Sequence, residues 1–525
     1  MRLETVFASN ALRRPDHVAV ICGAHRVTYS ALRASMRLAA CGLYRLGVRP
    51  GDRVLLYLPN SIEFVQLLFA TIELGAIAVP VNTRLSANEL KHVTDDSTPV
   101  VVAFDAGVRD LIRPSLSHLT DCRALVLGKP QDKEIGIEQI LSGPESALPD
   151  LPASGAEEAD DCLIMYTSGT TGKAKGAVVT HANLMIQCAY MYGSQWDVGE
   201  DDRYLVITPL AHRTGISRLI GALGLGGTLV VMERFDPVKA LDMIETERVT
   251  VAGMVPTILR ILLPHLRKDP EKCRSLRRLI VAAEAFPVPL KRDIMALLPQ
   301  VQIHCPYGLT EAAVTNLGHA EQMTHPASVG RPLPGIEVRM VDDAGCSVDQ
   351  GEVGELLVRA GAPGRDAVFR GYFNRPDETA AAIRDGWFHT GDLARRDPEG
   401  YLYIVDRKKD MVLSGGFNIY SKEVECALIL HPDIADAAVI GVPDETFGEA
   451  VAAFVETRGD ARLTAEQVIE HCRVQLASYK KPRHVYFVDA LPRNAVGKVL
   501  KNELREMAAK NGDPAQACGG RLAPP

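Results

Sequence analysis

The sequence predicts an α/β protein that ends in a smaller α+β part. Residues 16–150 alternate short β-rich runs with helical stretches, and the alternation resumes between 161 and 335. Examples are the runs Val18–Ile21, Tyr29–Leu46 and Val54–Leu58. Such alternation is typical of helices packed on mostly parallel sheets. At 525 residues the chain is also too long for one ordinary core, so two or more domains are expected.

The character of the sequence changes after residue 335. Between 336 and 405 the turns are closely spaced and the strands short, which indicates an antiparallel or barrel-like section. The charge cluster Asp406–Asp410 separates it from a compact α+β pattern. That pattern has helices at Lys422–Leu430 and Ala465–Leu476 and strands at Ala437–Val442 and Val451–Glu456. We therefore expect an N-terminal domain (1–405), a boundary in the charge cluster (406–409), a C-terminal domain (410–510) and a disordered tail (511–525).

Composition excludes several classes of protein. The chain is 47% hydrophobic and 23% charged with a net charge of −7, and no basic run invites nucleic acid. Eleven cysteines are scattered without a CxxC spacing, which is typical of reduced thiols in a cytoplasmic protein. The N-terminus lacks an apolar signal core, and the apolar windows 62–81 and 215–232 fit a helix followed by a core strand better than a membrane span. Oligomeric state cannot be read from the sequence.

The segment Tyr166–Val178, YTSGTTGKAKGAV, is the strongest functional signal. Glycines allow backbone N–H groups to crowd an anion, while hydroxyls and lysines add hydrogen bonds and positive charge. The polyphosphate ligands expected from this loop are Thr167, Ser168, Gly169, Thr170, Thr171, Gly172, Lys173 and Lys175. The loop is not a Walker motif, because Thr167 and Ala174 occupy positions that the motif reserves for Gly and for Ser or Thr. The alternative is a flexible surface linker.

This loop resembles the signature of the AMP-forming adenylating enzymes, which include acyl- and aryl-CoA synthetases, peptide-synthetase adenylation domains and luciferases. Six motifs follow the family's order between about residues 5 and 505. The resemblance implies a large N-terminal domain of two α/β sheet subdomains plus a small β-barrel-like subdomain. It also implies a small, mobile α+β C-terminal domain that acts as a lid.

Two further motifs match the family's nucleotide site. Tyr307, Gly308, Thr310 and Glu311 fit its Tyr-Gly-x-Thr-Glu pattern. The resemblance implies that Tyr307 stacks on adenine, that Thr310 contacts the α-phosphate, and that Glu311 holds Mg²⁺ together with Thr167. A helix start is the alternative for the Thr-Glu pair. Asp392, in a Thr-Gly-Asp sequence, would bind the ribose hydroxyls, although Gly-Asp is also a common turn.

The acyl site implied by the resemblance centres on His212, in the sequence PLAHRTG. A histidine at a strand end is alternatively structural. The residues expected to line the acyl pocket are Ala211, His212, Met254, Ala282, Phe286 and Val314. Arg213 is unexpected here, and for Arg218 a solvent-facing helix position is preferred over contact with a polar group of the substrate. Glu284 departs from the family's Gly- or Ala-rich turn against adenine.

The C-terminal motifs would serve both half-reactions. Arg407 would reach the ribose or a phosphate, and Lys409 falls at the family's hinge position. Ser414, Gly415 and Gly416 would line the tunnel for the pantetheine arm of coenzyme A, whereas a solvated charge run and a glycine turn are the alternative. Lys498 would bridge the carboxylate and the α-phosphate, rather than being only a surface charge. Lys501 is expected to have no part in either half-reaction.

The resemblance implies an enzyme that uses ATP, Mg²⁺ and coenzyme A. A carboxylate attacks the α-phosphorus of ATP to give acyl-AMP, and a thiol then attacks the acyl carbonyl, so Lys498, His212 and Glu311 are the expected catalytic residues. The mostly apolar lining favours a fatty, aromatic or polycyclic acid. One alternative is a stand-alone adenylation enzyme that loads a carrier protein. A non-catalytic nucleotide-binding regulator is another.

Overall fold

The chain forms two compact units. The computed structural model describes residues 2–117, 119, 121–142, 151, 156–167, 174–459, 461–493 and 498–511. The first unit comprises Met1–Val338 and Val358–His389, and the second comprises Arg339–Leu357 and Thr390–Pro525. The predicted hinge at 406–409 thus lies within the second unit, and its role as a hinge stays a prediction. The predicted tail, from 512 onward, lies outside the described residues.

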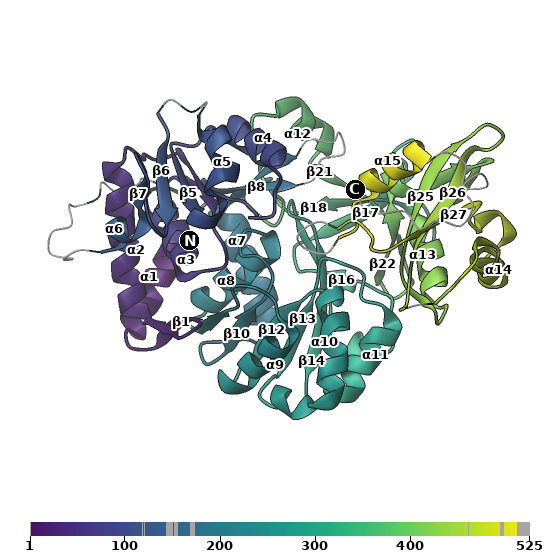
Figure 1. Cartoon of the computed structure of the whole chain (residues 1–525), viewed down its shortest axis with the longest axis horizontal. Helices are drawn as coiled ribbons and strands as arrows, with labels where there is room; N and C mark the ends of the chain where they lie inside the picture. Colours follow the sequence, from purple (N-terminus) through teal and green to yellow (C-terminus); the bar gives the residue numbers. More distant parts are fainter. Residues whose placement is uncertain are drawn as a thin grey trace. The chain divides into compact units, whose positions relative to one another are not determined.

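Two large sheets form the centre of the first unit (Figure 1). The nine-stranded sheet has the order β16-β15-β14-β13-β12-β10-β11-β1-β2. Its central strands, β14-β13-β12-β10-β11-β1, pair in parallel. Its strands are β1 (Val18–Cys22), β2 (His25–Thr28), β10 (Arg203–Val206), β11 (Thr228–Val231), β12 (Val251–Met254), β13 (Arg278–Val281), β14 (Gln302–Gly308), β15 (Ala313–Leu317) and β16 (Arg331–Pro332). Its antiparallel partners β2, β15 and β16 lie toward the two edges.

The eight-stranded sheet has the order β19-β9-β8-β4-β3-β5-β6-β7. Its strands are β3 (Arg53–Tyr57), β4 (Ile77–Pro80), β5 (Val101–Asp105), β6 (Arg123–Leu127), β7 (Ile135–Gly136), β8 (Asp161–Thr167), β9 (Lys175–Thr180) and β19 (Gly371–Tyr372). Strands β4 and β11 are buried along their whole length, as expected for parallel strands covered on both faces. The predicted alternation of strands and helices on parallel sheets is therefore confirmed.

Helices flank both sheets of the first unit. They are α1 (Leu3–Arg13), α2 (Tyr29–Arg45), α3 (Ile62–Glu73), α4 (Ala87–Ser97), α5 (Arg109–Leu116), α6 (Ile137–Leu141), α7 (His181–Gln187), α8 (Arg213–Gly224), α9 (Pro237–Thr246), α10 (Pro256–Lys268), α11 (Val288–Leu297) and α12 (Pro376–Ala382). A π-helix at Cys188–Gln195 continues α7. The two apolar windows are α3 with β4 and α8 with β11, as predicted. None of the helices in the described part of the chain combines the length and apolarity needed to cross a bilayer.

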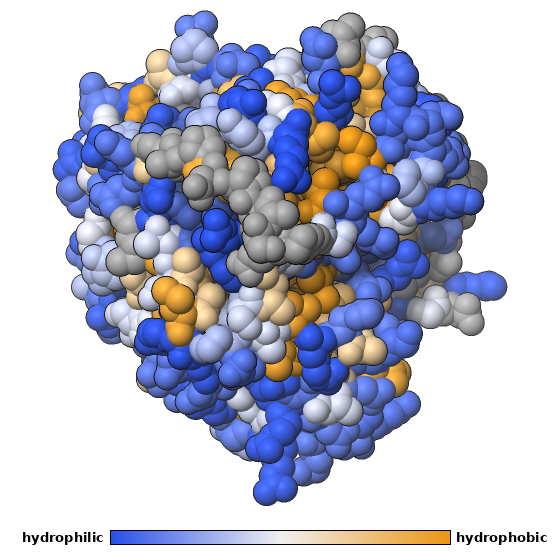
Figure 2. Space-filling model, turned by 90° about the vertical axis from the view of Figure 1, so that its left-hand side faces the viewer, coloured by the Kyte–Doolittle hydropathy of each residue, from blue (hydrophilic) through white to orange (hydrophobic). Residues whose placement is uncertain are grey.

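Most large apolar side chains are buried between these layers. The face shown in Figure 2 is mainly hydrophilic, and its apolar side chains gather in separate patches. Helix α8 is deeply enclosed, since Gly215–Leu223 are all buried. A helix without a solvent-facing side gains its stability from packing rather than from intrinsic propensity.

The second unit contains the C-terminal α+β pattern. Strand β21 (Trp387–Arg396) begins in the first unit beside β20 (Ile383–Arg384) and pairs in the second unit with β22 (Leu402–Arg407). Strands β17 (Glu337–Val341) and β18 (Gly354–Arg359) belong to the same five-stranded sheet. The other sheet has β23 (Val412–Ser414), β24 (Phe417–Ile419), β25 (Ile434–Asp444), β26 (Gly448–Thr457) and β27 (His484–Val488), with helices α13 (Ser421–Ile429), α14 (Ala465–Gln475) and α15 (Lys501–Asn511). The helices and strands predicted after residue 410 are all present.

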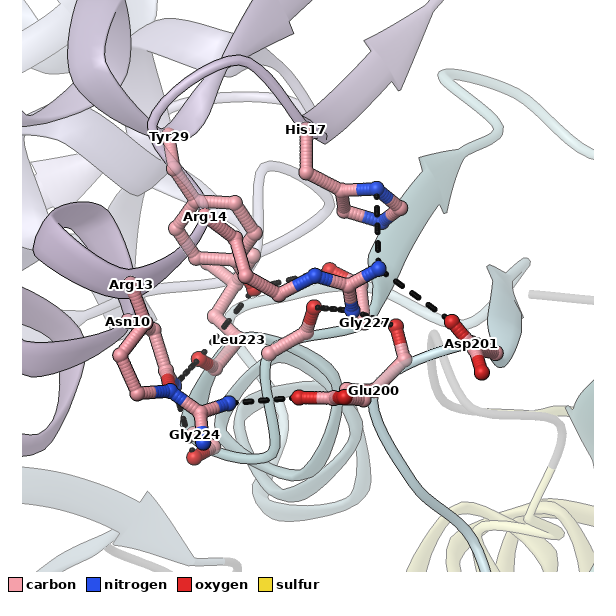
Figure 3. Close-up of polar contacts among 11 residues, drawn as sticks. Asn10, Arg13, Arg14, His17, Tyr29, Glu200, Asp201, Leu223, Gly224 and Gly227 are labelled. Carbon is pink, nitrogen blue, oxygen red and sulfur yellow. Dashed lines mark hydrogen bonds and ion pairs between the residues drawn. The ribbon is translucent and has the colours of Figure 1, made fainter.

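The C-terminal end of α8 is tied to α1 and α2 (Figure 3). Asn10 Nδ2 donates hydrogen bonds to the carbonyl oxygens of Leu223 and Gly224, both at 2.9 Å. The Tyr29 hydroxyl donates to Gly227 O at 2.8 Å, and Arg13 pairs with Glu200 at 2.6 Å. The last carbonyls of a helix have no intrahelical partner, and Asn10 satisfies two of them at the end of α8. Tyr29 holds the segment that follows the helix, at Gly227.

Asn60 holds the turn before α8. Its Nδ2 donates to the carbonyl oxygens of Thr208 and Met232, at 3.2 and 3.0 Å, and its Oδ1 accepts from Leu210 N at 2.7 Å. The side chain is buried, with 7% of the residue exposed. One amide therefore joins the segment after β10 to the segment after β11 and sets the position from which α8 starts.

We predict that Asn60→Ala lowers the free energy of unfolding of the first unit by about 2–3 kcal/mol, because three buried backbone groups lose their partner. Urea unfolding followed by tryptophan fluorescence measures this, since Trp196 and Trp387 both lie in the first unit. Asn88→Ala, at an exposed position of α4, is the matched control and should be neutral or slightly stabilising. Equal effects of the two substitutions would contradict the role given to Asn60.

Candidate active site

The predicted phosphate loop connects β8 to β9. Its residues Ser168, Gly169, Thr170, Thr171, Gly172 and Lys173 lie outside the described residues. Thr167 and Lys175, at the two ends, face each other across the antiparallel β8–β9 ladder. Thr167 Oγ1 also donates to Lys175 O at 3.5 Å. The ladder thus fixes both ends of the loop at the edge of the eight-stranded sheet.

Tyr372 connects this loop to the second nucleotide motif. Lys175 forms an ion pair with Glu378, and its Nζ lies 5.2 Å from the centroid of the Tyr372 ring. The Tyr372 hydroxyl donates to Glu311 Oε1 at 3.0 Å. Strand β19, which carries Tyr372, pairs with β9. The structure therefore brings Lys175 and Glu311 to one tyrosine that the sequence analysis did not identify, and no spacing in the sequence marks it.

The Tyr307–Glu311 motif spans the end of β14 and the turn that leads to β15. Leu309 N donates to Ala312 O at 2.7 Å, and no helix begins here, so the helix-start alternative is wrong. Glu311 is 9% exposed, whereas Tyr307 and Thr310 are half-buried. The motif lies at the carboxyl end of β14, a strand that pairs with β13 in parallel. Open α/β sheets bind their ligands at the carboxyl ends of such strands.

His212 is the N-cap of α8. Its ring accepts a hydrogen bond from Thr214 N, and Nδ1 lies 3.0 Å from Thr214 Oγ1. The residue is half-buried and follows the turn that Asn60 holds. A structural role as helix cap is therefore shown, and a role beside the substrate carboxylate stays a prediction.

The expected acyl-lining residues are distributed over several strand ends. Ala282 N donates to Met254 O at 3.3 Å, which brings these two together, while Val314 is fully buried in β15. Alternation along β12 turns the Met254 side chain to the face opposite Gly253. The position of β12 that faces α8 is therefore Gly253, which the sequence analysis did not identify. Ala211 and Phe286 are half-buried.

The turn after β13 has an unusual backbone. Ala283 adopts φ +74°, a left-handed conformation that costs a non-glycine residue about 1–2 kcal/mol. Glu284, the departure from the family pattern, accepts a hydrogen bond from Thr257 Oγ1 at 3.0 Å. Glu284 thus ties this turn to the start of α10. Strained backbone of this kind often occurs at ligand sites.

The preferred solvent-facing position of Arg218 is wrong. Arg218 is 3% exposed, and its Nη1 donates to Thr208 Oγ1. Burial lowers the pKa of both Arg213 and Arg218 to about 10. The error has a physical reason, because α8 is buried on all sides and its sequence has no polar face that could place an arginine outward.

The second unit carries its own cluster of expected nucleotide ligands. Arg407 Nε lies 2.6 Å from Asp392 Oδ1, and the Asp392 side chain is 4% exposed. The two residues face each other across β21 and β22, so the strand pairing sets their contact. Asp392 N also donates to Thr390 Oγ1 at 3.1 Å.

Lys498 belongs to the same cluster. Its side chain retains solvent-exposed surface, yet desolvation by the surrounding chain is the largest influence on it and lowers the pKa to about 8. The positive charges of Arg407 and Lys409 lower this pKa further, and the carboxylates of Asp392 and Asp410 oppose them. Lys498 is therefore protonated below about pH 8 and loses its charge above it.

Gly415 and Gly416 form a tight hairpin turn between β23 and β24. Both have positive φ, +57° and +82°, and Ser414 pairs with Phe417 across the turn. A two-residue hairpin with positive φ at both central positions favours glycine for steric reasons alone. The glycine-turn alternative is therefore present in the structure, and the pantetheine tunnel stays a prediction.

The predicted hinge residues are held in place within the second unit. Asp406 is 5% exposed and accepts a hydrogen bond from Ser421 Oγ at 3.0 Å, at the start of α13. Burial lowers the pKa of Lys409, and Arg505 pairs with Asp410 at 2.8 Å. Rotation about Lys409 would therefore have to preserve or exchange these contacts.

The donor set near Glu311 fits Mg²⁺ that arrives with a nucleotide. No group of three or more metal-ligating side chains occurs in the described part of the chain. Mg²⁺ is usually bound by one or two carboxylates, with water and substrate phosphates as the other ligands. A single carboxylate that is positioned by a tyrosine meets this requirement.

Comparison with known protein families identifies both parts of the chain. The model described as "AMP-binding enzyme" matches residues 7–373, and "AMP-binding enzyme C-terminal domain" matches residues 423–498. A feruloyl-CoA synthase from Amycolatopsis sp is 38% identical over 495 residues, which cover 94% of this chain and 96% of that protein.

Two other relatives extend the comparison. The long-chain-fatty-acid–CoA ligase FadD13 of Mycobacterium tuberculosis is 37% identical over 489 residues, covering 92% of this chain and 93% of that protein. Among solved structures, o-succinylbenzoate CoA synthetase (MenE) from Bacillus subtilis, in complex with its acyl-adenylate intermediate, has a TM-score of 0.84 and 30% identity. The match covers 95% of this chain and 97% of that one.

We predict that Tyr372→Phe raises the Mg²⁺ concentration needed for half-maximal pyrophosphate release by about tenfold or more, because Glu311 loses the hydrogen bond that orients it. A titration of Mg²⁺ at saturating ATP measures this. Tyr190→Phe, at a residue that is 39% exposed, is the matched control and should leave the titration unchanged. An unchanged titration in the Tyr372 variant would mean that Glu311 needs no such support.

Proposed function

Since the chain belongs to the AMP-binding enzyme family, we propose that it is an ATP-dependent ligase that joins a bulky hydrophobic carboxylic acid to coenzyme A through an acyl-AMP intermediate. The observation that carries this proposal is the similarity to CoA ligases over nearly the full length of both proteins. The relatives are named for aromatic and long-chain acids, which agrees with the apolar acyl lining. ATP and coenzyme A are available in the cytoplasm, the location we propose for the enzyme.

The first half-reaction joins the carboxylate to the α-phosphorus and releases pyrophosphate. The chain's own residues position the reactants and offset negative charge, and no side-chain nucleophile is required. We assign Lys498 to the carboxylate and α-phosphate, Thr310 to the α-phosphate, and Lys175 with the loop 167–173 to the leaving phosphates. Glu311 and Thr167 would hold Mg²⁺, which when bound offsets phosphate charge.

The remaining contacts concern orientation. Tyr307 would stack on adenine, and Asp392 with Arg407 would hold the ribose. His212, fixed as the cap of α8, would face the reacting carboxylate. In the second half-reaction a thiol sulfur attacks the acyl carbonyl carbon and AMP leaves with the bonding electrons. Ser414, Gly415 and Gly416 would guide the pantetheine arm to that carbon.

A screen of carboxylic acids for pyrophosphate release tests the acid. Each buried methylene contributes about 0.8 kcal/mol, so about five extra methylenes should raise kcat/KM roughly a thousandfold over acetate. Offering free coenzyme A and a holo carrier protein in parallel tests the acceptor, and we expect thioester formation with free coenzyme A. A preference for the carrier protein would favour the stand-alone adenylation alternative, and the absence of acid-dependent pyrophosphate release would contradict the ligase proposal.

We predict that Lys498→Ala lowers the rate of adenylate formation by about 10²–10³, because one well-placed positive charge is lost from the first transition state. The variant should still convert supplied acyl-AMP and coenzyme A to thioester at nearly the normal rate. In the wild type, kcat/KM for adenylation should fall by about tenfold per pH unit above about pH 8, as Lys498 loses its proton. The second half-reaction should show no such fall.

Lys510→Ala, at an exposed position of α15, is the control for this pair of assays. Lys501 cannot serve, because it pairs with Glu425 at 2.8 Å and donates to Ser421 Oγ at 2.6 Å. The expectation that Lys501 is dispensable is therefore unsafe, since its removal would leave the Glu425 carboxylate without its cation. Loss of both half-reactions in Lys498→Ala would assign that lysine a structural role instead.

A further inference from the structure

Arg218 is a buried cation in the first unit without an anionic partner. The residue is 3% exposed, and its Nη1 donates a hydrogen bond to a neutral group, the hydroxyl of Thr208. Within the described part of the chain no carboxylate lies within ion-pair distance of it. Burial lowers the pKa of Arg218 to about 10, so the guanidinium stays charged at neutral pH. Tyr192 acts in the opposite direction and raises this pKa.

Gly253 provides the space that the guanidinium occupies. A Cβ placed on Gly253 would overlap Nε and Cζ of Arg218, so any other residue there would displace the side chain. Gly253 is the third residue of β12, and Thr208 lies just beyond the end of β10. The charge is thus held near the carboxyl ends of two adjacent parallel strands, on the side of the sheet that α8 covers.

The same side of the sheet carries a buried imidazole, that of His304, without a hydrogen-bond partner among the described residues. Val206, Gly253, Ile280 and His304 are in register across four adjacent parallel strands, so their side chains point to one face. His304 is 5% exposed, and both of its ring nitrogens lack a hydrogen-bond partner among the described residues. Burial lowers the pKa of His304 to about 4, so the ring is neutral and offers one donor and one acceptor.

Aromatic rings and an aliphatic residue lie between these two polar groups. The Trp196 ring is 6.1 Å from the His304 ring and 4.6 Å from the Tyr192 ring, centroid to centroid. Tyr192 in turn packs against Gly221 of α8, one turn beyond Arg218. Ile280 lies in the strand between Gly253 and His304. The region therefore combines apolar walls with a guanidinium that has no carboxylate partner and an imidazole that has no hydrogen-bond partner among the described residues.

Helix α8 also relates this region to the reacting carboxylate. His212, which we assign to that carboxylate, caps the helix, and Arg218 lies six positions further along. Six residues of α-helix rise roughly 9 Å. The Arg218 side chain reaches back from there to Thr208 and Gly253, so its guanidinium is placed to meet a part of the acid other than the carboxyl group beside His212.

We propose that Arg218 binds a second carboxylate of the acid, so that the preferred substrate is a diacid with an apolar body. The inference rests on the proposed function and narrows its substrate class. A guanidinium is well suited to this task, because its planar fork of N–H donors matches a carboxylate. The substrate would supply the anion that the protein does not.

A matched series of acids tests this proposal. Each α,ω-dicarboxylic acid is compared with its monomethyl ester, which has nearly the same size but one charge fewer. At the optimal length, kcat/KM for pyrophosphate release should be about tenfold to about a hundredfold higher for the diacid, the range expected for one buried charged hydrogen bond. Arg218→Met should abolish or invert this preference, and Arg218→Lys should restore part of it.

Stability and a control variant separate specificity from folding. Arg218→Met removes an unpaired buried charge, so its melting temperature should be equal to or above that of the wild type. Arg267→Met, at an exposed arginine of α10 that pairs with Asp293, should leave the diacid preference unchanged. If the wild type has equal kcat/KM for a diacid and its monomethyl ester, and Arg218→Met does not change the ratio of the two values, the inference is overturned while the ligase function stands. If no acid releases pyrophosphate, the proposed function fails and the inference fails with it.

Discussion

The fixed position of α8 is the constraint on which the proposed acyl site of the first unit depends. At its start, the Asn60 amide holds the segments after β10 and β11 through three hydrogen bonds. At its end, Asn10 takes up two of the last carbonyls. A helix fixed at both ends cannot slide along the sheet, so His212 at its cap and Arg218 in its second turn keep set positions over β10 and β12.

Two charged side chains of restricted exposure are arranged in opposite ways. Glu425, which is half-buried, lies beside Lys501 and also accepts from Val439 N at 2.9 Å, so that carboxylate has a cation and a donor. Arg218 has neither a carboxylate nor a second recorded hydrogen bond within the described residues. Burying a charge without a counter-charge costs free energy of folding. That contrast is why we look to the substrate for the missing anion.

The sequence predicted the layered fold well because strand and helix periodicity follow directly from burial. The windows that became α3 with β4 and α8 with β11 are examples. The family motifs could be found at Tyr307–Glu311 and Asp392 for another reason, since they are short and local. Tyr372, Gly253 and the buried position of Arg218 could not be predicted, because each depends on which distant strand or helix packs beside it. For Gly415 and Gly416 the sequence was ambiguous, because a pair of glycines suits both a tight hairpin turn and the predicted tunnel for the pantetheine arm.

The charges of the second unit show how a lysine can be matched to a polyphosphate. Desolvation is the largest influence that lowers the pKa of Lys498 to about 8; Arg407 and Lys409 act in the same direction, and Asp392 and Asp410 oppose them. The charged form of Lys498 is therefore disfavoured in the protein without its ligand. A phosphate group placed among these residues would reverse the balance, because it favours the charged form of every cation near it. A bound nucleotide would therefore raise the pKa of Lys498 from about 8 and keep the lysine charged to higher pH.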